Sequence, residues 1–480
     1  MNSDSIDQER CSVSIKSYES LSNEMIQVEK KLVRKLDYIY VMPCLGLLIV
    51  VQFFDKGALN YSSVLGIRED NYINDFEFGW LGSIFFIGYL VCQIPNAYFI
   101  QKLHLGKYLG AITMLWGIVL GVTSASKNFT HLAVFRFLLG VFEAGVLSCA
   151  YMIVSRVYRR KEQANRIGVI YLSGGGAIAI GGLLCYGIGH MEGVAQLRAW
   201  QWVMILLGSG TVAFGIVCYF LLIDDAKVIA TSDDERKLIE LRIKDNAVVA
   251  TRKINPQQIL EALKECRYYC FSAFSFFVSL QNGALSVFGS IITRGFGFSN
   301  LNTILLGVPS GAMYCIFIFI AITCHNKFKN SMMYTGCGML SISVVGLILV
   351  LVIPINQAKL IGLYICVAYI GALVLVMTSI SNNVSGYTKK IFYNCSMVFF
   401  SAIGNFVGPQ LMIPSQSPLY IGGLITYIGA NLVCILSLLI ARRTMSEANI
   451  LRQPKQKLEN HNEESIDITD KQDDQFIYKL

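Results

Sequence analysis

Four charged residues, Asp55, Lys56, Arg136 and Glu143, lie inside long apolar stretches of this sequence. A charge near the centre of a bilayer costs upward of about 2.5 kcal/mol, so such residues usually pair with one another and line a polar cavity. Two acids and two bases can compensate each other fully. One interpretation is a set of static ion pairs that lock two helices together. The other, which is compatible with it, is a site that binds a proton and a charged solute.

The spacing of these residues favours a shared cavity. Arg136 and Glu143 are seven residues apart, which places them on one face of a helix, about 10.5 Å apart along its axis. Asp55 and Lys56 are adjacent, about 100° apart around an ideal helix, and Gly57 would allow a local irregularity that turns both inward. A carboxylate in a half-dry cavity can bind a proton near neutrality, and a nearby cation opposes this. A substrate that occupies the cation would therefore release the carboxylate to take up a proton.

The rest of the chain consists largely of segments that can hold such residues in a membrane. Of its 480 residues, 54% are hydrophobic and 15% are charged, whereas soluble proteins are about 25% charged. A membrane-spanning helix needs about 20 mostly apolar residues. Twelve stretches meet this requirement: 39–60, 79–100, 108–126, 131–154, 167–189, 200–223, 268–292, 303–324, 332–354, 359–381, 391–413 and 419–441. The sequence therefore predicts an all-α membrane protein with twelve transmembrane helices.

The net charge of +8 comes from the short loops between the predicted spans. Loops after even-numbered spans hold eleven basic residues and one acid, Glu162, whereas loops after odd-numbered spans hold five of each. Because positively charged loops stay in the cytoplasm, both termini and the central polar segment should be cytoplasmic. The basic excess indicates topology and not a nucleic-acid surface. The 14 cysteines include no CxxC pair, and we expect no metal site and no cofactor.

The order of the segments suggests a duplication. A polar tail (1–38), six spans (39–223), a central segment (224–267), six more spans (268–441) and a second tail (442–480) follow one another. Two short matches relate the halves at nearly one offset: Gly57-Ala58-Leu59-Asn60 with Gly283-Ala284-Leu285-Ser286, and Tyr158-Arg159-Arg160-Lys161 with Tyr387-Thr388-Lys389-Lys390. Two six-helix pseudo-repeats of this kind place a substrate site near the bilayer midplane between them.

Three polar residues of the second half are expected to face that site. Gln281 and Asn282 occupy the repeat positions of Asp55 and Lys56, and Asn405 lies in the eleventh predicted span. For each of them, hydrogen bonding between helices is at least as good an interpretation as substrate contact.

The polar segments are expected to carry no chemistry. The central segment should form surface helices packed against the bundle, one with a capping box at Ser232 and Glu235 and one that opens at Pro256. Both tails are polar and mixed in charge, and we expect them to lack fixed structure.

Several stretches resemble the major facilitator superfamily and, within it, the fungal allantoate permease family of anion:cation symporters. They include FFDKGALNY (53–61), GYLVCQIPNAYF (88–99), RFLLGVFEAGVL (136–147), YRRKEQANRIG (158–168), NGALSVFGSIITRGFGFSNLNTILLGVPSGA (282–312) and IGNFVGPQL (403–411). The arginine-to-glutamate spacing is shared with bacterial sugar-acid symporters and vesicular glutamate transporters, whose substrates are also organic anions. The resemblance spans both halves and implies the major facilitator fold.

The resemblance also implies roles for the charged residues. By position, Asp55 and Glu143 would bind protons, Lys56 would contact a substrate carboxylate, and Arg136 would hold Glu143 or Asp55 between turnovers. Three further polar substrate contacts are implied: Gln281, Asn282 and Asn405. The chain departs from the pattern in two places. Many relatives have arginine at the position of Lys56, and a lysine cannot make the bidentate contact to a carboxylate that arginine makes. The loop QKLHLGKY (101–108) lacks the aspartate of the general superfamily.

The sequence thus predicts a proton-coupled symporter that imports a small organic anion, such as a ureide, a vitamin or an amino-acid-like carboxylate, by alternating access. The expected partners are this carboxylate, protons and membrane lipid, and the expected state is a monomer in the plasma membrane. The alternative is a non-transporting nutrient sensor on the same fold. An intramembrane enzyme is disfavoured because the sequence has no HExxH, GxSxG or P-loop motif.

Overall fold

The computed structural model describes residues 23–229, 255–328, 330–456, 468–473 and 476–480, together with Ser232, Glu235, Arg236, Leu238, Ile239 and Arg242 of the central segment. Within these residues twelve helices are long and apolar enough to cross a membrane, and no strand occurs. The prediction of an all-α membrane protein with twelve spans is confirmed.

The helices fall into two groups of six spans. The first group is preceded by α2 (Asn23–Lys35) and contains α3 (Met42–Ser62), α5 (Asp75–Lys102), α6 (Leu105–Val122), α7 (Phe129–Glu143) with α8 (Val146–Val157), α9 (Arg160–Gly189) and α10 (Ala199–Leu221). The second is preceded by α12 (Pro256–Leu263) and contains α13 (Cys266–Gly295), α14 (Asn300–Leu305) with α15 (Gly307–Lys327), α16 (Met332–Val352), α17 (Lys359–Ile365) with α18 (Tyr369–Asn383), α19 (Tyr387–Val407) and α20 (Ile421–Gln456).

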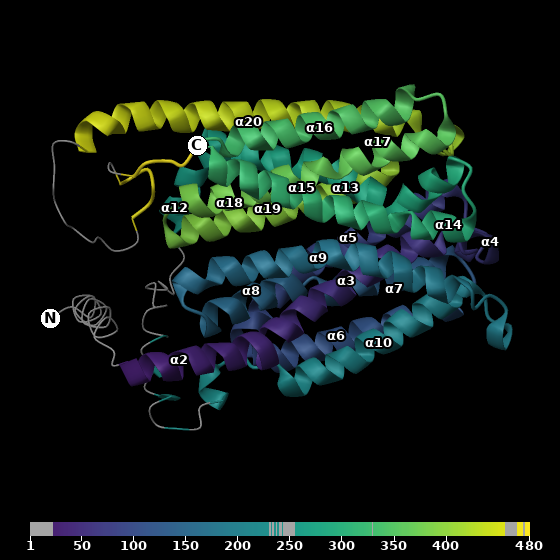
Figure 1. Cartoon of the computed structure of the whole chain (residues 1–480), viewed down its shortest axis with the longest axis horizontal. Coiled ribbons are helices and arrows are strands. Elements are labelled where there is room, and N and C mark those ends of the chain that lie inside the picture. Colours follow the sequence, from purple (N-terminus) through teal and green to yellow (C-terminus); the bar gives the residue numbers. More distant parts are fainter. Residues whose placement is uncertain are drawn as a thin grey trace.

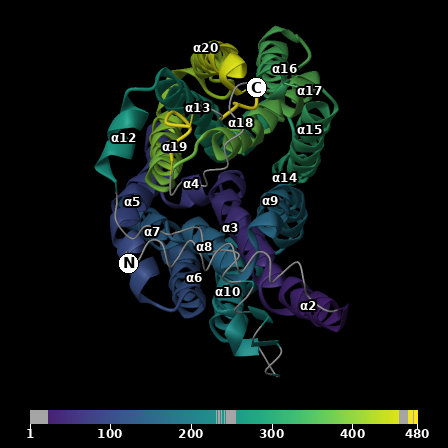
Figure 2. The ribbon, with the colours of Figure 1, turned by 90° about the vertical axis from the view of Figure 1, so that its left-hand side faces the viewer.

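The two groups form two bundles that lie side by side, the first in purple to teal and the second in green to yellow (Figure 1). The helices α2 and α12 and the last turns of α20 lie at one end of the molecule, which we call the terminal face. The short helices α4 (Ile67–Asp70) and α14 lie at the opposite end, the far face. Figure 2 views the molecule from the terminal face and shows α3 and α9 of the first bundle near the boundary between the bundles, with α14 next to α9.

Hydrogen bonds join the two bundles in the part of the molecule toward the far face. Four bonds contribute among the described residues: the Ser290 N–H donates to Asn60 Oδ1 at 2.8 Å, the Tyr420 hydroxyl to the Asp75 carboxylate at 3.2 Å, the Ser83 hydroxyl to the Phe406 carbonyl at 2.6 Å, and Gln410 Nε2 to Ser83 Oγ at 3.0 Å. An edge-to-face contact between Phe78 and Phe288 adds apolar contact between the bundles. The bundles are therefore closed against each other on this side.

Small residues allow α9 and α15 to approach closely across the same boundary. A Cβ atom on Gly311 would collide with the backbone nitrogen of Ala179. Close approach of helices through glycine is a common means of association in membranes, where packing replaces the hydrophobic effect. The closed boundary thus depends on the absence of a side chain at Gly311.

We expect Gly311→Val to weaken this closed state, since overpacking a tight contact costs about 1–3 kcal/mol. The matched control is Gly176→Val on α9, because nothing lies within 4 Å of a Cβ placed there. Spin labels at the exposed far-face residues Tyr72 and Ile355, in a background without reactive cysteines, measure the separation of the bundles. Gly311→Val should populate longer distances, and identical distance distributions in the two variants would contradict this dependence.

Two predicted spans are interrupted near their middle. The fourth breaks at Ala144–Gly145, between α7 and α8, and the tenth passes through a 3₁₀ turn at Cys366–Ala368 between α17 and α18. A Cβ on Gly145 would lie 3.0 Å from Asn96 Oδ1, so this glycine allows α5 to pack against the break. At Gly57, in contrast, α3 continues without the irregularity that the sequence would allow.

The tails are more ordered than predicted. The N-terminal tail contains the helix α2, and α20 continues beyond the predicted twelfth span (419–441) to Gln456. Residues 468–473 and 476–480 return to the second bundle, where Asp470 is fully buried. The expectation that the tails lack fixed structure is therefore wrong for these segments, which are held by ion pairs and hydrogen bonds to distant residues. Residues 1–22, 457–467, 474 and 475 of the tails lie outside the described residues.

The returning C-terminal segment completes a buried charge cluster at the terminal face. Lys389, which is fully buried, forms ion pairs with Glu261 at 2.8 Å, Glu265 at 2.5 Å and Asp470 at 3.0 Å. Asp470 also pairs with Arg267. Buried charges are tolerated when they are paired and hydrogen-bonded, so the bundle depends on this carboxylate from the tail.

The central segment behaves as predicted where the structure describes it. The Glu235 N–H donates to Ser232 Oγ at 3.2 Å, and α12 begins at Pro256. Arg242 is buried and binds Glu162 at 2.7 Å, which anchors the segment to the start of α9. The segment packs against the membrane bundles as expected, through Arg242 on the first and through α12 on α19 of the second.

Candidate functional site

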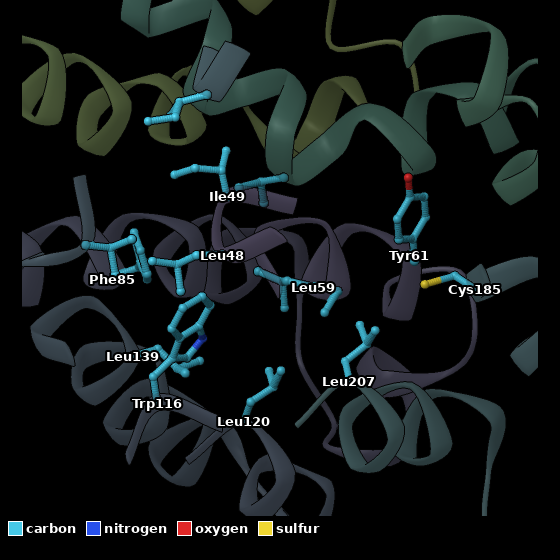
Figure 3. Close-up of a cluster of buried hydrophobic side chains, with 14 of the residues drawn as sticks. Leu48, Ile49, Leu59, Tyr61, Phe85, Trp116, Leu120, Leu139, Cys185 and Leu207 are labelled. Atoms are coloured by element: carbon cyan, nitrogen blue, oxygen red, sulfur yellow. The ribbon is translucent and has the colours of Figure 1, made fainter. Parts of the chain in front are cut away.

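The charged residues of the first bundle lie in an apolar interior. Figure 3 shows side chains of Leu48, Leu59, Trp116, Leu120, Leu139 and Leu207 gathered between its helices. All of these are at most 7% exposed. In such a low-dielectric setting an ionic interaction is stronger and an unpaired charge is more costly than in water.

Lys56 and Glu143 form an ion pair across α3 and α7. Lys56 Nζ lies 2.7 Å from Glu143 Oε1, and Gln52 Nε2 donates to the same oxygen at 2.8 Å. Gln52 and Lys56 are one helical turn apart on α3, so both reach the same carboxylate. The Lys56 side chain is 34% exposed, whereas Glu143 is 2% exposed. The cation is therefore accessible and its counterion is enclosed.

Two aromatic rings frame the exposed cation. Lys56 Nζ lies 6.0 Å from the ring centroids of both Phe53 and Phe85, a distance at which a cation is attracted to the ring face. A ligand anion that reaches the ammonium group would compete directly with Glu143.

Asp55 faces away from this pair, into the first bundle. Its Oδ2 atom accepts a hydrogen bond from Thr211 on α10 at 3.2 Å, while Oδ1 is buried without a hydrogen-bond partner among the described residues. A cavity of about 10 Å³ lies here, lined by both Asp55 and Arg136, close to the minimum of about 10–15 Å³ that holds one water. The open oxygen suits a water molecule or a bound proton.

Arg136 shares this cavity but does not bind either carboxylate directly. In the described part of the chain no carboxylate oxygen lies within 4 Å of its guanidinium group, since Glu143 is held by Lys56 and Gln52 instead. Arg136 is 8% exposed. The implied role of holding Glu143 or Asp55 is not realised as a direct contact in this conformation, and Arg136 acts on both through space.

The helix break lies immediately beyond Glu143. The helix α7 ends at Glu143 itself, and Gln93 Nε2 donates to the Ala144 carbonyl at 3.4 Å. Interrupted helices in transporters commonly lie where polar backbone lines a cavity. The break therefore places the buried carboxylate beside an irregular stretch of backbone.

The second bundle contributes neutral groups at the repeat-related position. Asn282 Nδ2 donates to Asn405 Oδ1 at 2.8 Å, and the Tyr369 hydroxyl donates to Asn282 Oδ1 at 3.0 Å. Asn405 is anchored by its donation to the Ser401 carbonyl at 2.8 Å. Two of the three predicted contacts of this half, Asn282 and Asn405, are thus brought together, with Tyr369 as a partner.

Gln281 is instead part of the packing of the second bundle. It is 1% exposed, donates to the Cys366 carbonyl at 3.0 Å and accepts from Asn431 at 2.6 Å. Asp55 and Gln281 occupy matching repeat positions, and each bonds to the last span of its own bundle through Thr211 and Asn431 respectively. In this conformation Gln281 follows the alternative interpretation of hydrogen bonding between helices.

Sequence reasoning missed three residues of this arrangement: Gln52, Thr211 and Tyr369. Gln52 has a detectable signal, because it is a lone amide in an apolar stretch one turn before Lys56. The hydroxyl groups carry no such signal, since threonine and tyrosine are ordinary in membrane spans.

Comparison with known proteins agrees with this architecture. The profile described as Major Facilitator Superfamily matches residues 45–409. The allantoate permease of Saccharomyces cerevisiae is 28% identical over 472 residues, covering 94% of this chain and 87% of the relative. The thiamine pathway transporter THI73 of the same yeast is 29% identical over 460 residues, with the same coverage.

Solved structures show the same fold at low identity. A bacterial homologue of the human lysosomal transporter Spinster, in an inward-facing and occupied conformation, has a TM-score of 0.66 at 15% identity and covers 85% of this chain and 97% of its own. A D-xylose-proton symporter has a TM-score of 0.62 at 12% identity and covers 83% and 96%.

Proposed function

Because the chain belongs to the Major Facilitator Superfamily and is a multi-pass membrane transporter rather than an enzyme, we propose that it is a proton-coupled symporter for a small organic anion. The observation that carries this proposal is the Lys56–Glu143 pair, in which an accessible cation is neutralised by an enclosed carboxylate.

The coupling follows from competition for Lys56. An anionic substrate that binds the ammonium group displaces Glu143, which is then buried with the Gln52 amide as its remaining partner. A buried, unpaired carboxylate is costly and becomes neutral by taking up a proton. Substrate binding and protonation of Glu143 therefore favour each other, and Asp55 with its open oxygen is a second proton site beside Arg136.

The neutral polar groups of the second bundle would bind the rest of the substrate. Asn282, Asn405 and Tyr369 offer amide and hydroxyl groups and no charge. This set suits a molecule with one carboxylate and further polar groups, such as the ureide, vitamin or amino-acid-like acids suggested by the sequence. The similarity to an allantoate permease supports the ureides within this group.

Alternating access would use the boundary between the bundles. The contacts toward the far face represent one closed gate, and the transport cycle requires them to open. The basic loops support a cytoplasmic terminal face with both termini inside, which makes the described conformation inward-facing. We place the protein in the plasma membrane as a monomer.

The test is uptake of a panel of labelled carboxylates by cells that express the chain, at external pH 5 and pH 7, with and without a protonophore. We expect one class of acid to accumulate faster at pH 5 and the protonophore to abolish the accumulation. Uptake that is independent of both would contradict proton coupling. Purified protein in liposomes that binds a carboxylate but moves none would favour the sensor alternative.

A further inference from the structure

A cavity on the terminal face lies outside the transport site. It has a volume of about 280 Å³ and lies between the loop that joins α12 to α13, the last turns of α20 and the C-terminal segment. Its polar lining includes Lys264, Arg267, Thr444, Arg452, Lys471 and Tyr478. No step of the proposed transport cycle uses these residues.

The acids next to this cavity are already neutralised. Glu265 lines it but pairs with Lys389 at 2.5 Å and Arg267 at 2.7 Å and accepts a hydrogen bond from Tyr393. Asp470 is held by Arg267, Lys389 and the Tyr478 hydroxyl. Glu265 and Asp470 are therefore matched by Arg267 and Lys389, and Glu261, which also pairs with Lys389 at 2.8 Å, does not line the cavity.

Three cations of the lining remain uncompensated. Lys264 and Lys471 are exposed and have no acidic partner among the described residues. Arg452 donates to the Phe476 carbonyl at 2.9 Å and lies over the Tyr478 ring at 5.1 Å, so its partners are neutral. The cavity is consequently a site for an anion, and the convergence of two lysines and one arginine favours a group with more than one negative charge.

The surroundings of the cavity favour a ligand that belongs to the membrane. The helices α13 and α20 that border it are both spans. Exposed apolar side chains lie on these helices near the cavity: Tyr269 is 57% exposed, Ile450 65% and Leu451 74%. Aromatic and aliphatic side chains beside basic residues are typical of the membrane–water interface, and basic pockets between helices at this level bind lipid headgroups.

We propose that this cavity binds the phosphate headgroup of an anionic phospholipid. The phosphate would lie among Lys264, Arg452 and Lys471, with the acyl chains along the apolar surface of α13 and α20. In a lipid whose headgroup is a phosphate monoester, as in phosphatidic acid, this group carries a charge of about −1.5 to −2 at neutral pH, which complements three uncompensated cations. Since Lys471 belongs to the C-terminal segment and Lys264 to the bundle, the lipid would tie the two together.

Native mass spectrometry of the purified full chain tests this proposal, with phosphatidic acid and phosphatidylcholine of identical acyl chains as probes. We expect wild type to retain phosphatidic acid preferentially. The double variant Lys264→Gln/Lys471→Gln should bind phosphatidic acid about 30-fold more weakly, because each of the two lysines contributes a similar free energy of attraction to the anionic headgroup. The matched control, Lys102→Gln/Lys327→Gln, removes two terminal-face lysines outside the cavity and should bind as wild type does.

Three outcomes would overturn the proposal. One is equal retention of the two lipids by wild type, and another is equal loss of phosphatidic acid in the two double variants. The third concerns a soluble ligand: inorganic phosphate in millimolar excess should leave the lipid bound, and displacement of the lipid would assign the cavity to free phosphate. Thermal unfolding without added lipid checks that both double variants are folded.

Discussion

Replacing Glu143 by glutamine will abolish concentrative uptake while substrate binding and exchange continue. The amide keeps the shape of the side chain and can still hydrogen-bond to Gln52, but it cannot bind a transported proton or neutralise Lys56. With pH 5 outside and pH 7 inside, one coupled proton supplies about 2.7 kcal/mol, enough for about 100-fold accumulation. The variant should reach equal concentrations on both sides.

Proteoliposomes loaded at pH 7 and placed at pH 5 measure this loss directly. Counterflow exchange in the same vesicles reports binding and movement without net coupling. Glu143→Asp is the matched control, since it retains a carboxylate and should keep at least part of the accumulation. Asp55→Asn should lose accumulation in the same way, because the amide removes the second proposed proton site. Undiminished accumulation in both Glu143→Gln and Asp55→Asn would refute proton coupling at this site.

Asp470→Asn will destabilise the second bundle by about 3–5 kcal/mol, the usual cost of removing one partner from a buried ion pair. The substitution leaves Lys389, which is fully buried, and Arg267 with one fewer counterion. Thermal unfolding in detergent measures the effect as a lowered midpoint. The control is Glu447→Gln, which breaks the exposed pair with Arg443 and should leave the midpoint nearly unchanged, since exposed ion pairs contribute little to stability. Equal midpoints for the two variants would show that the tail carboxylate is dispensable.

The same carboxylate predicts a direction for the pH dependence of stability. Burial opposes ionisation of Asp470, but Arg267, Lys389 and the hydrogen bond from Tyr478 outweigh burial and lower the pKa of Asp470 below its ordinary value of 3.8. An acid whose pKa is lower in the folded state stabilises the fold above its unfolded pKa and loses this contribution as the pH falls through the folded value. The difference between wild type and Asp470→Asn should therefore be constant near neutrality and shrink only in strong acid.

Much of the fold could be predicted from the sequence because membrane-spanning helices require long stretches of apolar residues. Length and apolarity of the twelve stretches identify the helices, and four charges within them indicate the candidate site. The sequence could not show which charges pair, since Glu143 lies 87 positions from Lys56 along the chain. The spacing along α7 suggested a cavity shared by Arg136 and Glu143. In the structure, Glu143 instead binds Lys56 and Gln52, which lie on α3.

The rest depended on contacts between distant segments. Gln281 and Asn282 are adjacent residues that both carry a side-chain amide. Gln281 nevertheless lies in the interior of the second bundle, whereas Asn282 belongs to the network with Asn405 and Tyr369. Asp470 lies in a polar tail whose composition is typical of disorder, and its order comes from Arg267 and Lys389 more than 80 positions away. Local pattern cannot reveal such partners.

The unequal charge of the two repeats has a consequence for how this family can diversify. The groups proposed to bind protons lie in the first bundle. The groups proposed to recognise the ligand lie in the second bundle and are neutral amides and a hydroxyl. Exchanging one neutral polar residue for another alters shape and hydrogen bonding without disturbing a buried ion pair. Gene duplicates could therefore acquire new nutrients by changes in the second repeat alone, while inheriting an intact energy-coupling device in the first.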